Sequence, residues 1–142
     1  MKYKSHKRPR TPRCPYCGSV SVLRDSSYVY QNDVTHRKLY VCARYPACDS
    51  YVSAHRGSLR PEGTLANSEL RNRRIRAHKA LDRIWQLGIM SRADTYLWLQ
   101  DTLGVSEAQA HIGMCAEYYC DRIIDASNQL VAKHTGGVSR DE

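Results

Sequence analysis

The 142-residue sequence predicts an α+β protein in two parts. The first part, residues 14–55, combines four of the six cysteines with short β-branched and aromatic runs, which are typical of a small antiparallel β unit. The second part, residues 67–132, repeats apolar residues at helical spacing between capping residues, which predicts a compact unit of about four helices. Residues 56–66 contain two glycines and a proline, and their composition predicts a linker.

Three strands are expected in the first part, over residues 27–31, 38–42 and 50–53. Residues 31–33 (Gln-Asn-Asp) have the composition of a hairpin turn between the first two strands. A unit this small cannot bury enough apolar area to fold alone. We therefore expect a metal ion or a partner to stabilise it.

The four cysteines of this part have the spacing of a zinc site. Cys14 and Cys17 form a C-x-x-C pair followed by Gly18, and Cys42 and Cys48 enclose five residues at the end of a predicted strand. A tight turn lets a C-x-x-C pair hold one tetrahedral ion, and a β-hairpin brings the second pair to the first. Four thiolates leave no open position on Zn²⁺, so the sequence predicts one structural zinc ion in a zinc ribbon. The alternative is four unrelated buried cysteines.

The other two cysteines fall in the helical part. Cys115 and Cys120 both lie on apolar stripes, where free cysteine behaves as a small hydrophobic residue. His111 precedes Cys115 by four residues, a spacing that can also bind metal. We interpret Cys115 and Cys120 as free core cysteines.

The ribbon segment, residues 14–52, resembles the C-terminal zinc ribbons of type IA DNA topoisomerases. The resemblance rests on Cys14-Pro-Tyr-Cys17-Gly18 and on the Tyr45-Pro46 pair between two cysteines that enclose five residues. It implies an accessory module that binds single strands and lacks the topoisomerase active site.

Further short motifs follow the ribbon. They are residues 61–66 (Pro-Glu-Gly-Thr-Leu-Ala), Leu70-Arg71, Ala77-His78, Asp82, Ile84-Trp85 and residues 111–114 (His-Ile-Gly-Met). With these motifs, about residues 14–125 resemble a family of small zinc-ribbon proteins of bacteriophages and prophages. The resemblance implies a phage or prophage protein and brings no particular activity with it.

The net charge of +8 is unevenly distributed. Residues 1–13 hold six Lys or Arg and no acid, residues 66–80 hold five bases and one acid, and residues 81–142 hold five bases and nine acids. The basic front half predicts contact with a polyanion such as nucleic acid. Residues 1–13 are expected to form a flexible basic arm, and the polar residues 133–142 a flexible tail. The N-terminus has no apolar signal region, so we expect a cytoplasmic protein, in the bacterial host.

Twelve residues are candidate nucleic-acid contacts. Cations would neutralise phosphates, and an aromatic ring would stack on a base. The alternatives are a solubilising arm, tyrosines used as core residues, and a solvated end of the first helix. Arg73 and Arg74 fall within the apolar arc of the helix expected over residues 67–86, and we expect neither to support the core. The candidates are Lys2, Lys4, Lys7, Arg8, Arg10, Arg13, Arg44, Tyr45, Arg71, Arg73, Arg74 and Arg76.

Four helices are expected in the second part: residues 67–86 before Gly88, residues 91–104 between a Ser91 cap and Gly104, a short one opened by a Ser106–Gln109 capping box, and residues 116–130. Residues 95–114 loosely fit a helix-turn-helix, but the would-be recognition helix has no Arg or Lys. We interpret this region as a packing unit or a protein-docking surface.

No constellation of residues predicts catalysis. His78 and Asp82 could form a general base, but no nucleophile elbow, Gly-rich phosphate loop or carboxylate cluster accompanies them. The sequence therefore favours a non-catalytic zinc-ribbon nucleic-acid-binding protein. The alternative is a protein-interaction module, an inhibitor or adaptor of a host or phage enzyme, acting through the acidic helical half.

Overall fold

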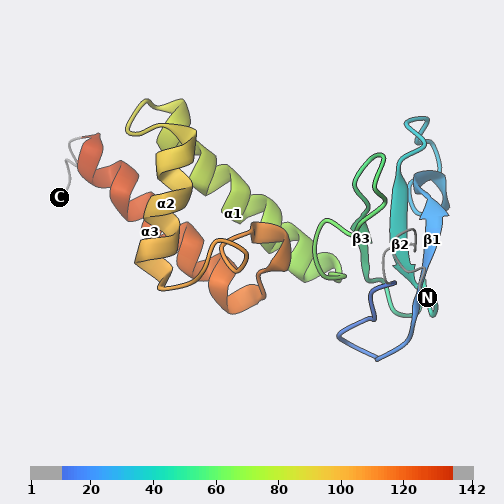
Figure 1. Cartoon of the computed structure of the whole chain (residues 1–142). Coiled ribbons are helices and arrows are strands. Elements are labelled where there is room, and N and C mark those ends of the chain that lie inside the picture. The colour runs from blue at the N-terminus through green and yellow to red at the C-terminus, as the bar shows by residue number, and fades with distance from the viewer. Residues whose placement is uncertain (1–10, 136–142) are drawn as a thin grey trace, which may run out of the picture. The chain divides into compact units, whose positions relative to one another are not determined.

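The computed structural model describes residues 11–135, and the chain divides into two compact units, Met1–Ser68 and Glu69–Glu142. A three-stranded antiparallel sheet in the first unit and helices in the second confirm the predicted α+β class (Figure 1). No helix in residues 11–135 combines the length and the apolar character needed to cross a membrane. The elements are β1 (Ser21–Asp25), a 3₁₀ turn (Ser26–Tyr28), β2 (Lys38–Cys42), β3 (Tyr51–Ser53), α1 (Ser68–Gln86), α2 (Arg92–Leu103), a second 3₁₀ turn (Ile112–Met114) and α3 (Glu117–His134).

The central strand β2 supplies core residues to both faces of the sheet, whose order is β1-β2-β3. Because side chains alternate along a strand, Leu39 and Val41 lie on one face, and Tyr40 and Cys42 lie on the other. All four are at most 4% exposed. The sheet of three short strands therefore has two small cores instead of one buried face and one solvated face.

Each face has its own packing partners. Leu39 and Val41 pack with Tyr51 on the first face, and Tyr45 adds a half-buried ring to that cluster. The second face joins two of the cysteines to Tyr40 and to residues from beyond β3. The tyrosine hydroxyl donates to the carbonyl of Leu59 at 2.6 Å. The buried members of this second core are Cys14, Tyr40, Cys42, Ala54 and Leu65.

The first strand lies earlier than the sequence predicted. β1 covers Ser21–Asp25, whereas the expected strand at residues 27–31 begins inside a 3₁₀ turn. The Asp25 carboxylate accepts hydrogen bonds from the backbone N–H of Ser27 at 3.1 Å and from its hydroxyl at 2.7 Å. This local capping ends the strand, because an Asp side chain that binds the backbone two residues on favours a turn.

Residues 56–66 are part of the first unit, so the prediction of a linker over these residues is wrong. The chain turns back after β3 and forms isolated bridges that pair Ala54 with Pro61 and Tyr51 with Ala66. Leu65 and Ala66 are at most 1% exposed. The glycines and the proline serve a turn that folds onto the edge of β3, and the boundary between the units falls after Ser68.

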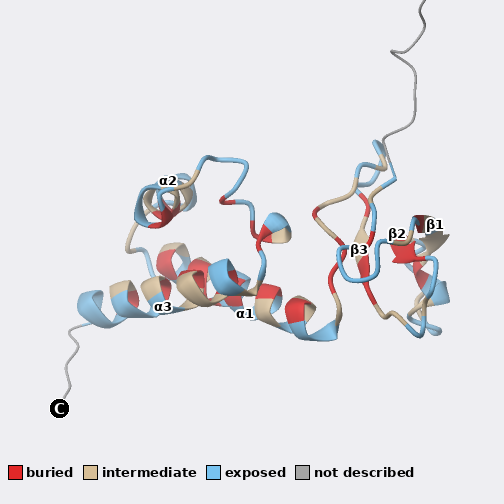
Figure 2. Cartoon of the chain, turned by 90° about the horizontal axis from the view of Figure 1, so that it is seen from below, coloured by how far each residue is buried: buried red, intermediate tan, exposed pale blue. Residues whose placement is uncertain are grey.

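The first two helices confirm the predicted capping signals. Ser91 caps α2, and its hydroxyl accepts from the backbone N–H of Asp94 at 3.0 Å. Gly104 ends α2 in the left-handed conformation with φ 68°, and Gly88, two residues beyond the end of α1, takes φ 75°. Buried positions recur along α1 at helical spacing, as expected for a helix with one core-facing side (Figure 2).

The predicted third helix is wrong, although its capping box forms. The backbone N–H of Ser106 donates to the Gln109 side chain at 3.0 Å, and the backbone N–H of Gln109 donates to the Ser106 hydroxyl at 3.3 Å. Residues 107–110 nevertheless form a turn, because His111 and Cys115 take extended backbone conformations on either side of the 3₁₀ turn. The described part of the chain therefore has no recognition helix at this position.

The last helix is longer than predicted. α3 begins at Glu117 and continues to His134, four residues beyond the expected end at residue 130. Lys133 and His134 lie in its last turn, where positive side chains interact favourably with the helix dipole. The start of the expected flexible tail is thus helical, and residues 136–142 lie outside the described residues.

The two arginines of the apolar arc of α1 hold the helical unit together, which corrects the expectation that neither supports the core. Arg74 is 8% exposed, and its Nε donates to the carbonyl oxygen of Cys115 at 3.0 Å. Arg73 forms ion pairs with Asp121 and Glu117 of α3 and with Glu69 one turn earlier on α1. These contacts explain why arginines occupy core-facing positions.

Replacing Arg74 by Ala is expected to destabilise the helical unit by about 1.5–3 kcal/mol. The reason is that the buried carbonyl of Cys115 loses its hydrogen bond from a charged donor. Arg76, which is exposed on the same helix, is the control, and Arg76→Ala should change the free energy of unfolding by less than about 0.5 kcal/mol. Urea unfolding followed by far-UV circular dichroism measures both. Equal midpoints for the two variants would contradict the assignment.

Candidate metal centre

Two turns supply the four ribbon cysteines. The first holds Cys14 and Cys17; the N–H of Gly18 donates to the carbonyl of Cys14 at 2.9 Å, and Gly18 takes φ 75° as the chain leaves the turn. Glycine adopts this left-handed conformation without strain. The turn leads directly into β1, whose Ser21 lies opposite Cys42 of β2. Antiparallel pairing of β1 and β2 thus brings the first pair of cysteines beside the second.

The second turn follows β2 and spans the five residues between Cys42 and Cys48. The N–H of Tyr45 donates to the carbonyl of Cys42 at 2.9 Å, and the N–H of Cys48 donates to the carbonyl of Arg44 at 3.1 Å. The N–H of Arg44 also points to the sulfur of Cys42 at 3.5 Å. The wider spacing thus accommodates a hydrogen-bonded turn that directs both sulfurs to the same point.

The four sulfurs have the geometry of one tetrahedral zinc site. They all lie within 4.8 Å of one another, with 3.6 Å between the Sγ atoms of Cys14 and Cys48 and 3.5 Å between those of Cys17 and Cys42. Zn–S bonds of about 2.3 Å in a tetrahedron place sulfurs about 3.8 Å apart. The donor set fits one structural Zn²⁺ with no open coordination position, as the sequence predicted.

Two serines that sequence reasoning missed lie against the sulfurs. The Ser50 hydroxyl lies 3.1 Å from the Sγ of Cys14 and 3.7 Å from that of Cys48, and Ser50 is completely buried. The Ser19 hydroxyl lies 3.3 Å from the Sγ of Cys17. The signal is present in the sequence, because a serine follows the last cysteine of each pair by two residues. Outer partners of this kind orient metal ligands.

Two of the thiols, those of Cys17 and Cys42, differ in acidity before metal binds. Hydrogen bonds with the Ser19 side chain and backbone lower the pKa of Cys17 to about 6. Burial raises the pKa of Cys42 to about 12. Since zinc binds the thiolate, the ion must displace a proton from Cys42 at neutral pH, whereas Cys17 already favours the ionised form. Zinc binding is therefore coupled to proton release.

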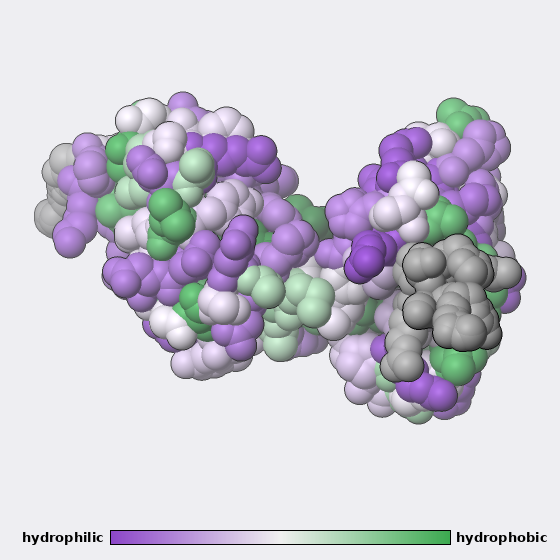
Figure 3. Space-filling view, viewed as in Figure 1, coloured by the Kyte–Doolittle hydropathy of each residue, from purple (hydrophilic) through white to green (hydrophobic). Residues whose placement is uncertain are grey.

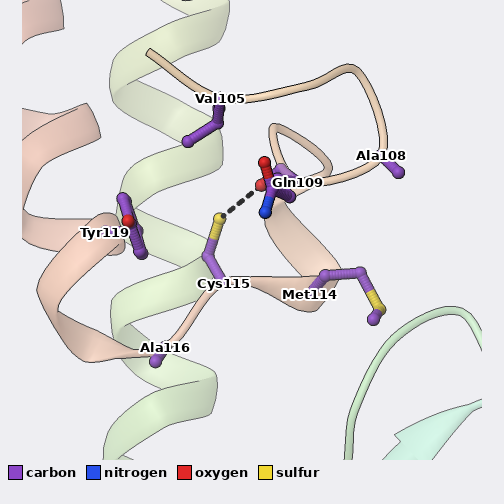
Figure 4. Close-up of a pocket in the computed structure, with 7 residues that line it drawn as sticks. All are labelled: Val105, Ala108, Gln109, Met114, Cys115, Ala116 and Tyr119. Carbon is purple, nitrogen blue, oxygen red and sulfur yellow. Dashed lines mark hydrogen bonds between the residues drawn. The ribbon is translucent and has the colours of Figure 1, made fainter. Parts of the chain in front are cut away.

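The remaining two cysteines lie elsewhere and belong to the core of the helical unit. Cys115 and Cys120 are at most 2% exposed and are free thiols. The Cys115 thiol points into a hollow beside Tyr119 and donates to the carbonyl of Gln109 at 3.7 Å (Figure 4). Among residues 11–135, the group of cysteine, histidine and acidic side chains close enough to hold a metal is the ribbon set.

The structure distributes the candidate nucleic-acid contacts unevenly. Arg13 and Arg44 are exposed beside the two zinc turns, and Arg13 donates to the Gly18 carbonyl at 2.9 Å. Arg76 is exposed on α1 and Arg71 is half-buried, whereas Arg73 and Arg74 are engaged within the helical unit. The remaining candidates lie outside the described residues and are Lys2, Lys4, Lys7, Arg8 and Arg10.

The tyrosines of the ribbon are divided between the core and the surface. Tyr45 is half-buried, with its ring centroid 5.7 Å from that of Tyr28 and 6.4 Å from that of Tyr51. Tyr51 is buried, whereas Tyr28 and Tyr30 are 44% and 49% exposed. The Arg24 guanidinium lies 4.2 Å from the ring centroid of Tyr28. Tyr28 and Tyr30 therefore offer more free ring surface than Tyr45, which sequence reasoning had chosen.

The fold and the four-cysteine site define a zinc-ribbon protein with an appended helical unit. Residues 10–130 match a protein family described as a zinc-finger-containing domain, DUF3268, and the chain belongs to this family. Comparison with curated proteins and with solved structures gave no match.

The purified protein is expected to hold one Zn²⁺ per chain, and Cys42→Ser should lose it and unfold the ribbon while α1, α2 and α3 stay folded. The reason is that the sheet has only two small cores, and two of the metal ligands form part of one of them. Native mass spectrometry measures zinc, and amide NMR spectra report on each unit. The control is Cys115→Ala with Cys120→Ala, which should keep the full zinc content. A zinc-free wild-type protein after expression in zinc-rich medium would contradict the site.

Ser50→Ala is expected to weaken zinc binding by about 10-fold or more, because the ligand thiolates lose a buried hydrogen-bond donor. Ser53→Ala is the matched control, since Ser53 lies on β3 but has no side-chain contact with a cysteine among the described residues. Competition with a chromophoric zinc chelator measures the affinity. Equal affinities for the two variants would show that Ser50 does not support the site.

Proposed function

We propose that this protein binds nucleic acid without catalysing a reaction, through the zinc ribbon and the basic N-terminal segment. The observation that carries the proposal is where the charge lies. Residues 1–68 hold twelve Lys or Arg and four Asp or Glu, whereas residues 69–142 hold ten of each. The whole net charge of +8 thus belongs to the ribbon unit and its N-terminal segment. A positive charge of this size on so small a unit attracts a phosphate backbone.

The ribbon surface also offers aromatic rings next to cations. Tyr28 and Tyr30 expose 44% and 49% of their surfaces, and Arg24 lies 4.2 Å from the ring centroid of Tyr28. Exposed Arg13 and Arg44 flank the zinc turns. Rings for base stacking beside cations for phosphates favour a single strand over a duplex, because the bases of a duplex are already stacked. The resemblance of residues 14–52 to topoisomerase zinc ribbons supports the same choice.

The helical unit contributes less to this proposal than its arginines suggest. Arg73 and Arg74 stabilise the packing of α1 with α3 and with Cys115, so the contacts on α1 reduce to Arg71 and Arg76. On the face of this unit seen in Figure 3, hydrophobic residues are scattered among hydrophilic ones. The resemblance to phage and prophage proteins supports placing the activity in phage biology, as part of the same proposal.

The expected binding is strongly salt-dependent and requires zinc. Affinity for a labelled single-stranded oligonucleotide should fall as salt rises, and Arg44→Gln should reduce the salt slope by about 0.7, the value for one lost phosphate contact on a single strand. Tyr28→Ala should cost about 1–3 kcal/mol and leave the slope unchanged, because a stacked base releases no counterion. Removing zinc should abolish binding by the ribbon. Fluorescence anisotropy with DNA and RNA, single- and double-stranded, measures these effects.

Lys133→Gln is the charge-matched control for Arg44→Gln, because Lys133 lies in the last turn of α3, in the unit without net charge. It should leave both the affinity and the salt slope nearly unchanged. Dissociation constants weaker than about 100 μM for every nucleic acid at low salt would overturn the proposal, since nonspecific binding is typically tighter than this. Co-purification of a single host protein at high salt, with no nucleic-acid binding, would favour a protein-interaction module instead.

A further inference from the structure

A basic pocket lies on the ribbon unit, apart from the zinc site. Its volume is about 210 Å³, and its walls come from the start of β2 and from the turn that follows β3. Five of the lining side chains are cationic or can become so: His36, Arg37, Lys38, His55 and Arg56. We infer that this pocket binds a phosphate group. The inference rests on the proposed nucleic-acid binding for the source of that phosphate.

The charges around the pocket leave an excess of cations. The Asp25 carboxylate lies 3.4 Å from His36 and 3.8 Å from Lys38. The Glu62 carboxylate lies 3.3 Å from Arg37 and 3.5 Å from His55. These two acids balance two of the three permanent cations.

The third permanent cation, Arg56, is exposed at the pocket and has no ion-pair partner among residues 11–135. Counting the permanent charges alone, the pocket therefore remains positive, which favours an anion over a metal cation.

Fixed hydrogen-bond donors in the pocket are incompletely used. Arg37 Nη2 donates to the Ala54 carbonyl at 3.2 Å, which anchors the guanidinium, and its Nε is buried with no partner in the described structure. Two backbone hydrogen bonds close the turn. The N–H of His55 donates to the carbonyl of Arg60 at 2.8 Å, and the N–H of Leu59 donates to the carbonyl of His55 at 3.0 Å. Neither bond uses the N–H of Gly57, which has no partner within the described chain. The buried Arg37 Nε is the kind of unsatisfied donor that indicates a missing acceptor, whereas the N–H of exposed Gly57 is open to a ligand.

The shape of the backbone suits the same ligand. His36 and Gly57 have positive φ angles, 57° and 89°. Backbone turns of this kind can present N–H groups to an anion. A phosphate carries several strong acceptor oxygens and accepts from guanidinium, ammonium and backbone donors at once. A carboxylate has two acceptor oxygens in one plane and would satisfy fewer of the donors that surround this pocket.

The test compares a pocket variant with a charge-matched control in the full zinc-loaded chain. Lys38→Gln with Arg56→Gln removes two pocket cations, and Arg60→Gln with Arg83→Gln removes two exposed cations that do not line the pocket. Titration of the wild type with inorganic phosphate should give saturable amide NMR shifts confined to residues 36–38 and 54–59. The pocket variant should lose these shifts, and the control should keep them.

Oligonucleotides then identify the source of the phosphate. Affinity for a single strand should fall about 10-fold in the pocket variant and less than about 3-fold in the control, because only the pocket variant loses a localised contact. Tighter binding of a 5′-phosphorylated strand than of its 5′-hydroxyl counterpart would identify a terminal phosphate, and equal binding an internal one. Oligonucleotide binding that falls equally in both variants, without phosphate shifts, would overturn the pocket and leave the proposed function standing. Phosphate shifts without any oligonucleotide binding would overturn the proposed function and leave the pocket as a site for another phosphate ester.

Discussion

The convergence of four sulfurs is the constraint on which the ribbon unit depends. Its sheet has three strands of at most five residues, and one of its two cores consists of five buried residues that include Cys14 and Cys42. These cysteines are therefore ligands and core residues at once. Zinc joins the turn before β1 to the turn after β2, so the ion fixes the same strand pairing that assembles its site. Burial that raises the pKa of Cys42 would oppose a bare thiolate there, and the metal removes this cost.

The helical unit solves a different problem, because it places charged groups inside a small core. Arg74 is 8% exposed and donates to the Cys115 carbonyl, which the extended backbone between the 3₁₀ turn and α3 leaves outside any helical ladder. A buried carbonyl without a donor costs about 1–3 kcal/mol, so the arginine supplies what the broken helix lacks. Arg73 acts beside it by pairing with Asp121 and Glu117. The extended backbone at Cys115 thus both ends the region of the predicted third helix and leaves the carbonyl to which buried Arg74 donates.

Local chemistry decided which features could be predicted from the sequence. Cysteine spacing predicted the four ligands, and Ser91 and Gly104 predicted both ends of α2, because these signals act within a few residues. The first strand, the supposed linker and the third helix could not be predicted, since each depends on contacts formed by folding. Asp25 redirects the chain after β1, and Leu65 becomes core only when its segment pairs with β3. Ser50 was recognisable in retrospect by its position two residues after Cys48.

Charge in the sequence and charge on the surface are different quantities in this protein. The densest cluster of arginines along the chain lies on α1, yet two of them, Arg73 and Arg74, contact other parts of the helical unit. The strands of the ribbon carry fewer arginines per residue than α1 does. Tyrosines and zinc ligands fill the small cores of the ribbon, so most of its cations lie at the surface. Where a metal site stabilises the core of a small unit, its charged side chains need not pack in that core and can stay at the surface. That division makes the ribbon, more than α1, the part of the molecule suited to a polyanion.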